Sequence, residues 1–298
     1  MPVAKFYTNG LTMGAGGNPN PTGGKRGNVV GWTQAAVRRH TRWLYSVDSA
    51  ALTGFGWAVT LTMRDIPATS AEFVALRRVY LQSLRDSGLL LRAHWIVEWT
   101  LRKRPHLHLA VYLDHSLSEV EARRILVEPW VRIAAQYGVS RNAQHIGRIT
   151  GALGWLEYLS KHASRGVAHY QRNGKPAGWD TTGRLWGKIG DWPEVEPLEA
   201  NLTRVEFFRF RRLVRSWRVA DARKIVALGQ PNSARISSAR RMLKCSDRTL
   251  SQVRGVSEWI SEDVGMALLA IASRDETTGE RAERATPAAS GSSHGAMV

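Results

Sequence analysis

One glutamate and two histidines within residues 94–113 have the types and spacing of a divalent-metal site. His106 and His108 are two residues apart on a β-prone run, so their side chains share one face of a strand. Glu98 lies on a second β-prone run, and a basic turn of residues 101–105 separates the two runs. The pattern predicts a β-hairpin on which a carboxylate and two imidazoles meet. This mixed oxygen and nitrogen set suits Mn²⁺, Mg²⁺ or Zn²⁺.

The register of the predicted hairpin decides which histidine faces Glu98. If Thr100 pairs with Arg104, Glu98 lies opposite His106; if Thr100 pairs with His106, Glu98 lies opposite His108. Both registers place the three side chains on one face, with facing Cβ atoms about 5 Å apart. A slip by one residue would separate them, because it turns every side chain of a strand to the other face. The competing interpretation is one buried core histidine and one solvated histidine.

The segments around this hairpin predict an α+β fold. Strand-like and helix-like patterns follow one another in the order β-α-β-β-α-β-α. The strand-like segments that flank the hairpin are residues 55–63 and 143–150, and the helix-like segments are residues 68–87, 116–137 and 153–163. This order predicts a ferredoxin-like split β-α-β core, with an antiparallel sheet and helices on one face. The other face is expected to stay open for a metal ion and nucleic acid.

Composition divides the rest of the chain into three parts. Residues 1–31 are rich in glycine, asparagine and proline and are expected to form a flexible arm before a central domain of residues 32–195. Residues 196–272 are expected to form a basic helical region with a long helix from Thr203 and a helical pair, or a helix-turn-helix, over residues 236–261. Residues 273–298 are expected to be a disordered tail.

The charge balance favours a polyanionic partner. The chain has 42 lysines and arginines against 25 acidic residues, a formal net charge of +17. This excess is typical of proteins that bind nucleic acid. One stripe of the helix from Thr203 carries Arg204, Arg211, Arg215 and Arg218. Because cations in such a stripe repel one another unless an anion lies near, these four are candidates for DNA contact.

Cysteine content and hydropathy favour a cytoplasmic protein. Cys245 is the single cysteine, so no disulfide can form within the chain, as suits a reducing compartment. No apolar run reaches 18 residues, so no transmembrane helix is expected. The first residues lack the apolar segment of a secretory signal.

A possible nucleophile follows the hairpin in the sequence. Tyr158 and Lys161 are three residues apart, so both would project from one face of the helix over residues 153–163. A neighbouring cation lowers the cost of forming the phenolate, whose ordinary pKa is near 10. With a metal ion that orients a phosphate, such a tyrosine could attack a DNA phosphodiester and leave a free 3′-hydroxyl. Alone, this spacing is uninformative; it gains weight because the histidine hairpin precedes it.

The motifs now identified resemble, in their order, those of the HUH endonucleases. They are Thr60-Leu61-Thr62, Glu98, His106-Leu107-His108 and Tyr158-x-x-Lys161. Over roughly residues 55–193 the chain most resembles the single-tyrosine replication initiators of rolling-circle plasmids and single-stranded DNA phages. The resemblance implies that His106, His108 and Glu98 bind Mn²⁺ or Mg²⁺. It also implies that Tyr158 nicks the origin and holds the 5′ end, while Lys161 positions or neutralises the scissile phosphate.

The expected function is therefore to nick one strand of origin DNA through a covalent 5′-phosphotyrosine, to rejoin it later, and so to start rolling-circle replication. The expected partners are single-stranded or hairpin origin DNA, the host replication machinery and a host helicase. The helicase is expected because no Walker A motif follows in the sequence. The expected location is the cytoplasm of a bacterial host. Tyr170 lies beyond the tyrosine helix, so a second catalytic tyrosine is not expected.

Three alternatives remain open from the sequence. A relaxase or transposase would use the same chemistry. A non-catalytic nucleic-acid-binding protein on a ferredoxin-like sheet would display aromatic side chains for base stacking. Trp95 and Trp99, however, should face away from Glu98, toward the core. A two-histidine phosphoesterase would need a second His-x-[Ser/Thr] motif, and His162-Ala163-Ser164 is the nearest match.

Overall fold

The computed structural model describes residues 1–15, 27–150, 167, 169–228 and 256–274. The chain divides into two compact units. Unit 1 comprises residues 1–201 and 250–262, and unit 2 comprises residues 202–249 and 263–298. The helix expected over residues 153–163, with Tyr158 and Lys161, lies outside the described residues.

A five-stranded antiparallel sheet forms the centre of unit 1. Its strands are β3 (Phe55–Leu61), β4 (Leu90–Trp99), β5 (Pro105–Leu113), β6 (His145–Arg148) and β7 (Trp186–Gly190). They lie in the order β6-β3-β5-β4-β7, with every neighbouring pair antiparallel. Numbered along the chain, the first four strands have the order 4-1-3-2, which is the expected split β-α-β arrangement. β7 extends the sheet beside β4.

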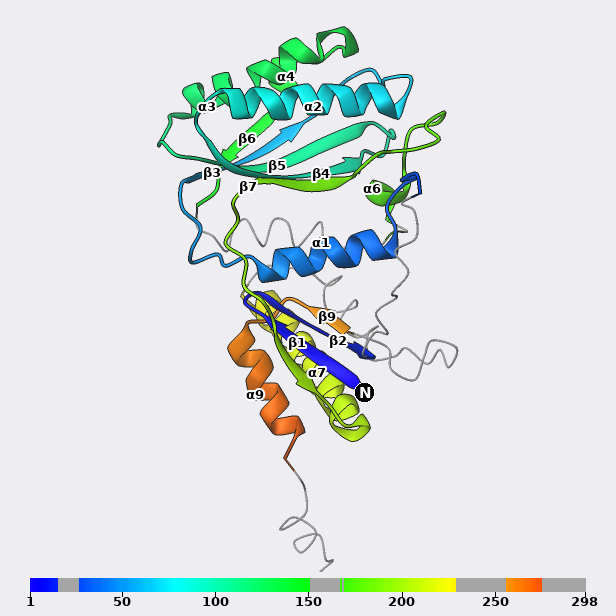
Figure 1. Cartoon of the computed structure of the whole chain (residues 1–298), viewed down its shortest axis with the longest axis vertical. Coiled ribbons are helices and arrows are strands. Elements are labelled where there is room, and N and C mark those ends of the chain that lie inside the picture. The colour runs from blue at the N-terminus through cyan, green and yellow to red at the C-terminus, as the bar shows by residue number, and fades with distance from the viewer. Residues whose placement is uncertain (16–26, 151–166, 168, 229–255, 275–298) are drawn as a thin grey trace, which may run out of the picture. The chain divides into compact units, whose positions relative to one another are not determined.

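Three helices cover one face of this sheet (Figure 1). They are α2 (Ser70–Asp86), α3 (Glu119–Leu126) and α4 (Glu128–Ile133). α3 begins with a capping box, in which Ser118 and Glu121 satisfy each other's backbone N–H groups. The single helix expected over residues 116–137 is wrong. It breaks at Val127, and Pro129 lies in the first turn of α4, where its missing N–H costs no hydrogen bond.

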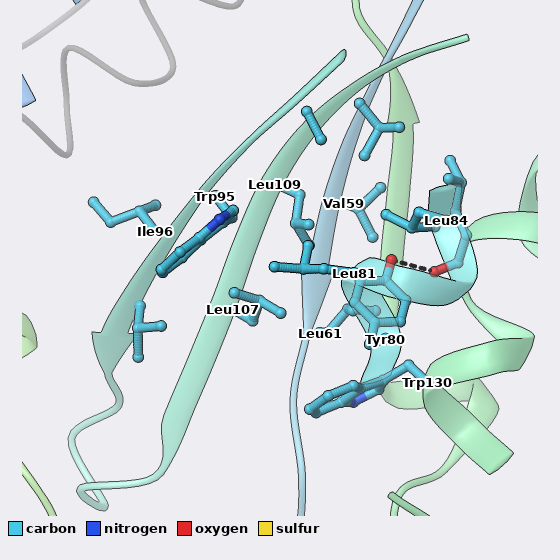
Figure 2. Packing of buried hydrophobic residues seen from close by; sticks show 14 of the residues in the cluster. Val59, Leu61, Tyr80, Leu81, Leu84, Trp95, Ile96, Leu107, Leu109 and Trp130 are labelled. Atoms are coloured by element: carbon cyan, nitrogen blue, oxygen red, sulfur yellow. Dashed lines mark hydrogen bonds between the residues drawn. The ribbon is translucent and has the colours of Figure 1, made fainter. Parts of the chain in front are cut away.

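The main hydrophobic core lies between these helices and the sheet (Figure 2). Trp95 of β4 and Leu109 of β5 point toward α2, where Tyr80 is fully buried. The Tyr80 hydroxyl donates a 2.8 Å hydrogen bond to the carbonyl of Leu126, and its ring meets Trp130 edge-on. Trp95 and Trp99 are 5% and 1% exposed. The prediction that they face the core is therefore confirmed.

The other face of the sheet is not open along its whole length. α1 (Gln34–Ser46) lies across it, so the expectation of helices on one face is wrong (Figure 1). His40 of α1 stacks on His94 of β4 with ring centroids 5.0 Å apart, and Trp43 contacts both His94 and Trp186. These aromatic side chains give the second face enough apolar surface to bind a helix.

A second, four-stranded sheet also belongs to unit 1. Its strands are β1 (Pro2–Tyr7), β2 (Gly10–Ala15), β8 (Leu198–Asn201) and β9 (Val256–Glu258), in the order β8-β1-β2-β9. The expected flexible arm is therefore wrong for residues 2–15, and the expected helical region is wrong for residues 198–201 and 256–258. Two buried cross-strand pairs hold the hairpin: Ala4 with Met13, and Phe6 with Leu11.

The described part of unit 2 is helical. α7 (Arg204–Ala227) begins where expected, because Thr203 and Glu206 exchange backbone and side-chain hydrogen bonds. α9 (Glu262–Ala272) follows β9, with its first residue assigned to unit 1. The possible helix-turn-helix falls mainly on residues outside the described ranges. Among the described helices, none is long and apolar enough to cross a membrane.

Candidate active site

The hairpin of β4 and β5 adopts the first of the two registers that the sequence allowed. Glu98 pairs with His106, and the Thr100 N–H donates to the Arg104 carbonyl at 2.9 Å. Lys103, at φ 59°, takes the left-handed conformation that turns the chain between the strands. The parity argument is thereby confirmed: Glu98, His106 and His108 all project from the same face of the sheet.

The three side chains differ in exposure. Glu98 is fully buried, His108 is 7% exposed, and His106 is partly exposed. The Oε2 atom of Glu98 lies 3.9 Å from Nε2 of His108, and the two histidine rings are 5.7 Å apart between centroids. Burial lowers the pKa of His106 below its ordinary value, and the opposing effect of the Glu98 carboxylate is smaller. His106 is therefore a neutral imidazole at neutral pH, with a lone pair available for a ligand.

Thr60 of β3 is a further member of the site. It pairs with His108 across the sheet, and its Oγ1 lies 3.0 Å from the Nδ1 of that histidine. If Nδ1 carries the proton and donates it to Thr60, Nε2 of His108 is the electron-pair donor on the side of Glu98. From the sequence, Thr60 was expected only as part of the Thr60-Leu61-Thr62 motif, because the spacing along one strand does not reveal its register with another strand.

The trio has the donor chemistry of a divalent-metal site without its closed geometry. Within the described ranges, no group of three His, Cys, Asp or Glu side chains is arranged to hold a metal ion. Two ligands of one ion, each bonded at about 2.1 Å, lie roughly 3.0–3.4 Å apart when they occupy adjacent positions. The 3.9 Å between Glu98 and His108 exceeds that spacing, so binding an ion in adjacent positions would require side-chain rotation.

A pocket of about 390 Å³ opens beside His106. Its other lining residues are Thr62, Thr100, Leu101, Arg102, Arg104, Tyr170 and Gln171. Tyr170 and Gln171 belong to the short helix α6 (Tyr170–Asn173), which contacts β4. Tyr170 was not expected to be a second catalytic tyrosine, because it lies beyond the tyrosine helix in the sequence, yet it lines the same pocket as His106.

The candidate DNA-binding arginines lie on α7 in unit 2. Arg204 is exposed, whereas Arg211, Arg215 and Arg218 are each half-buried. The same helix buries Phe207, Phe210 and Val214, and Trp217 is partly buried. The stripe is thus present on the helix, but three of its four arginines are only partly accessible to a ligand.

Comparison with known proteins identifies relatives along nearly the whole chain. Two are Xylella fastidiosa proteins, each named a putative replication protein: PDa0002 of strain Temecula1 and XF_b0001 of strain 9a5c. Both are 41% identical to this chain, over 272 residues (87% of this chain and 99% of the relative) and 283 residues (91% and 96%). The Replication-associated protein G2P of Pseudomonas phage Pf3 is 40% identical over 276 residues, which cover 90% of this chain and 96% of the phage protein.

The chain belongs to this replication-protein family. The likeness to the family reaches well beyond residues 55–193, because an alignment of 272 residues must include parts of both units. No protein-family model and no solved structure matches the chain.

Proposed function

We propose that this replication-family protein starts replication of a plasmid or phage genome by nicking one strand of origin DNA, with the chemistry of the HUH endonucleases. The hairpin register carries the proposal, because it sets Glu98, His106 and His108 on one face beside a pocket. Relatives named for replication in a bacterium and in a phage support the same role. The net charge of +17 suits a DNA substrate.

Nicking would transfer a phosphodiester from a sugar to a tyrosine. The Tyr158 oxygen would attack the scissile phosphorus, and the bond from phosphorus to the 3′ oxygen would break. That oxygen would take up a proton and leave as a 3′-hydroxyl, while the 5′ end stayed bound to Tyr158. Lys161 would neutralise charge on the phosphate. Because one ester replaces another, the reverse reaction would rejoin the strand.

Glu98, His106 and His108 would hold the Mn²⁺ or Mg²⁺ ion of the proposed site. When bound, such an ion polarises a phosphate and orients it for attack. Thr60 would fix the ring of His108 through Nδ1, so that Nε2 faces the position of the ion. Glu98 and His106 approach from paired positions on two strands, which keeps their backbones at a fixed separation.

DNA would be held by cations on both units. The turn between β4 and β5 carries Arg102, Lys103 and Arg104, of which Arg102 and Arg104 line the pocket. The α7 arginines, Arg204, Arg211, Arg215 and Arg218, would contact the backbone of single-stranded or hairpin origin DNA. Such contacts make affinity fall steeply with salt. A host helicase would open the duplex beyond the nick.

The decisive experiment tests for a covalent adduct. Labelled single-stranded oligonucleotides tiled across the replicon that encodes this chain are incubated with protein and Mn²⁺, then resolved under denaturing conditions. We expect one oligonucleotide to yield a protein adduct and a free 3′-hydroxyl fragment. The adduct should disappear with EDTA, in His106→Ala and in Tyr158→Phe. Tyr137→Phe is the matched control, because the Tyr137 hydroxyl donates a hydrogen bond to Glu72 of α2, on the opposite side of the sheet from Glu98 and His106.

An adduct that persists in Tyr158→Phe would remove that residue from the mechanism, and activity in EDTA would remove the metal ion. Binding without any adduct would favour the second candidate, a non-catalytic DNA-binding protein. The burial of Trp95 and Trp99 disfavours it in its base-stacking form, because the sheet tryptophans are unavailable to bases.

A further inference from the structure

We propose that Tyr170 is a stacking platform for an unpaired DNA base next to the scissile phosphate, within the pocket of His106. This inference rests on the proposed function and names the part of the substrate that the pocket takes. Tyr170 would be a positioning residue, acting through its ring on the base and not on the reacting phosphate. Its binding role is separable from catalysis, because it can be measured on DNA that is not cut.

The exposure of Tyr170 is unusual in this protein. Among the described Phe, Tyr and Trp side chains, Tyr170 and Phe55 are the most exposed, at 44% and 42%. Phe55 begins β3 and does not line the pocket, whereas Tyr170 does. An exposed ring beside a cavity can stack on any base, because every base presents a π face.

The Tyr170 ring lies against the ring of the preceding histidine. The His169 ring lies 4.6 Å from it between centroids, at an interplanar angle of 32°. The backbone N–H of Gln171 donates to Nδ1 of His169 at 3.3 Å, which caps α6 and fixes the histidine ring. A base that stacks on Tyr170 would therefore extend an existing pair of rings.

α6 is held firmly at the end of β4. The guanidinium of Arg172 is 4.1 Å from the centre of the Trp32 ring, and Arg172 is 2% exposed. A Cβ added to Gly174 would come within 2.6 Å of the Tyr170 carbonyl oxygen and 3.4 Å of the Trp99 Cβ. This close packing lets Tyr170 present its ring at a fixed place, which lowers the entropy lost when a ligand is ordered against it.

The remaining walls of the pocket suit a nucleotide. Arg102 and Arg104 supply cations for a backbone phosphate, and Thr62, Thr100 and Gln171 supply hydrogen-bonding side chains for a base edge. The base must be unpaired, because a base within a duplex is already stacked and paired. The pocket therefore fits single-stranded DNA at the nick site better than the duplex beside it.

The test measures affinity without cleavage. A fluorescein-labelled single-stranded oligonucleotide spanning the nick site, or the tightest-binding tile if none is cut, is titrated in EDTA with protein carrying Tyr158→Phe. We expect Tyr170→Ala to weaken binding roughly 5- to 150-fold, the range for loss of one base–aromatic stack. The conservative Tyr170→Phe should bind within about 2-fold of the parent, because phenylalanine retains the stacking ring. Phe55→Ala, which removes the other exposed aromatic ring, should bind as the parent does.

A second readout locates the base. 2-Aminopurine is placed at successive positions of the oligonucleotide, and its fluorescence should be quenched at one position by stacking. That quenching should vanish in Tyr170→Ala and persist in Tyr170→Phe. Unchanged affinity in Tyr170→Ala would overturn the inference. Equal losses in Tyr170→Ala and Tyr170→Phe would also overturn it, because the hydroxyl would then be the essential group.

These outcomes are distinct from those of the nicking experiment. A protein that forms no adduct, yet binds DNA through the Tyr170 ring, would refute the proposed chemistry and leave the stacking site standing. A protein that forms the adduct, but binds equally well after Tyr170→Ala, would refute the stacking site alone.

Discussion

Glu98 lies directly across the hairpin from His106, yet its carboxylate reaches diagonally to within 3.9 Å of Nε2 of His108. His108 in turn meets Thr60 on the next strand through Nδ1. Three adjacent strands, β4, β5 and β3, thus contribute side chains to one line of polar contacts. The candidate site is built on regular sheet positions, which hold their spacing better than loops do.

Replacing Thr60 with valine should weaken metal-dependent activity without unfolding the sheet. The valine keeps the shape but removes the oxygen that orients His108, and losing such a partner typically costs about 10- to 100-fold in metal affinity or activity. The measurement is the Mn²⁺ concentration for half-maximal nicking, with Mn²⁺ titration calorimetry as a readout independent of turnover. Thr12→Val, in the other sheet, is the control. An unchanged Mn²⁺ requirement in Thr60→Val would show that His108 needs no such support.

The buried His40–His94 pair should be a source of stability. Their Nε2 atoms lie 3.0 Å apart, and both side chains are fully buried between α1 and the five-stranded sheet. His94→Ala should lower the free energy of unfolding by about 2–4 kcal/mol, because it leaves a cavity and removes a buried hydrogen bond. Urea unfolding of both single variants and the double variant would test this. We expect a coupling energy of about 0.5–3 kcal/mol, and strict additivity would contradict the direct interaction.

The turn of the hairpin should bind backbone phosphates. In the Arg102→Gln, Arg104→Gln double variant, we expect weaker binding to single-stranded DNA. The slope of log affinity against log salt should be shallower by about 0.7 for each phosphate that the variant no longer neutralises. Fluorescence anisotropy over salt concentrations from about 50 to about 300 mM measures both quantities, because counterion release governs affinity in this range. The Arg78→Gln, Arg124→Gln double variant, which removes two exposed cations from α2 and α3, is the charge-matched control. Equal slopes in both proteins would place the DNA elsewhere.

The arginine stripe of α7 can be tested at its exposed end. Arg204 is exposed and within the stripe, whereas Arg212 is exposed on the same helix but outside it. Arg204→Gln should weaken binding to origin DNA and reduce the salt slope by about 0.7–0.9, while Arg212→Gln should not. Similar effects of both variants would mean that the stripe has no special role and that the charge of the helix acts as a whole.

The capping box of α3 should make stability depend on acidity. Hydrogen bonds from the side chain and backbone of Ser118 hold the pKa of Glu121 below its ordinary value. A carboxyl group with a lowered pKa stabilises the fold above its unfolded pKa, near 4.3, and this contribution is lost as pH falls through the folded pKa. Melting temperatures of the parent and Glu121→Ala should therefore differ most at neutral pH and converge in acid. A difference that grows in acid would contradict the assignment.

Strand parity made the site predictable, and tertiary contacts made its surroundings unpredictable. A hairpin with two histidines two residues apart allowed two registers, and both put Glu98 on their face, so the trio followed from the sequence. The helix starts at Ser118 and Thr203 can also be predicted from the sequence, because a capping box needs only two residues that are three positions apart. The packing of α1 could not be predicted in this way, because it depends on residues far away in the sequence. The α1 segment shows an apolar face, but nothing in it indicates that His94 and Trp186 are the side chains that it contacts.

Composition gave a wrong expectation for the first residues. The glycines from Gly14 onward dominate that stretch, whereas Ala4, Phe6, Leu11 and Met13 carry the alternation of two short strands. Their outer partners, β8 and β9, lie far along the chain and each has four residues or fewer. The position of Tyr170 was hidden for a similar reason, since it depends on the path of the chain beyond β6 and not on any nearby spacing.

The order of the four-stranded sheet has a consequence for the way the chain is made. β1 and β2 occupy the middle, so both edges of their hairpin stay unpaired until residues 198–201 and 256–258 have been synthesised. At about 5–20 residues per second, the gap between residues 15 and 258 lasts on the order of 10 to 50 s. The five-stranded sheet needs no strand beyond Gly190 and can close within that interval. The hairpin of residues 2–15 is therefore made early but gains its outer strands late. The five-stranded sheet, which carries Glu98 and His106, can be complete before the four-stranded sheet is.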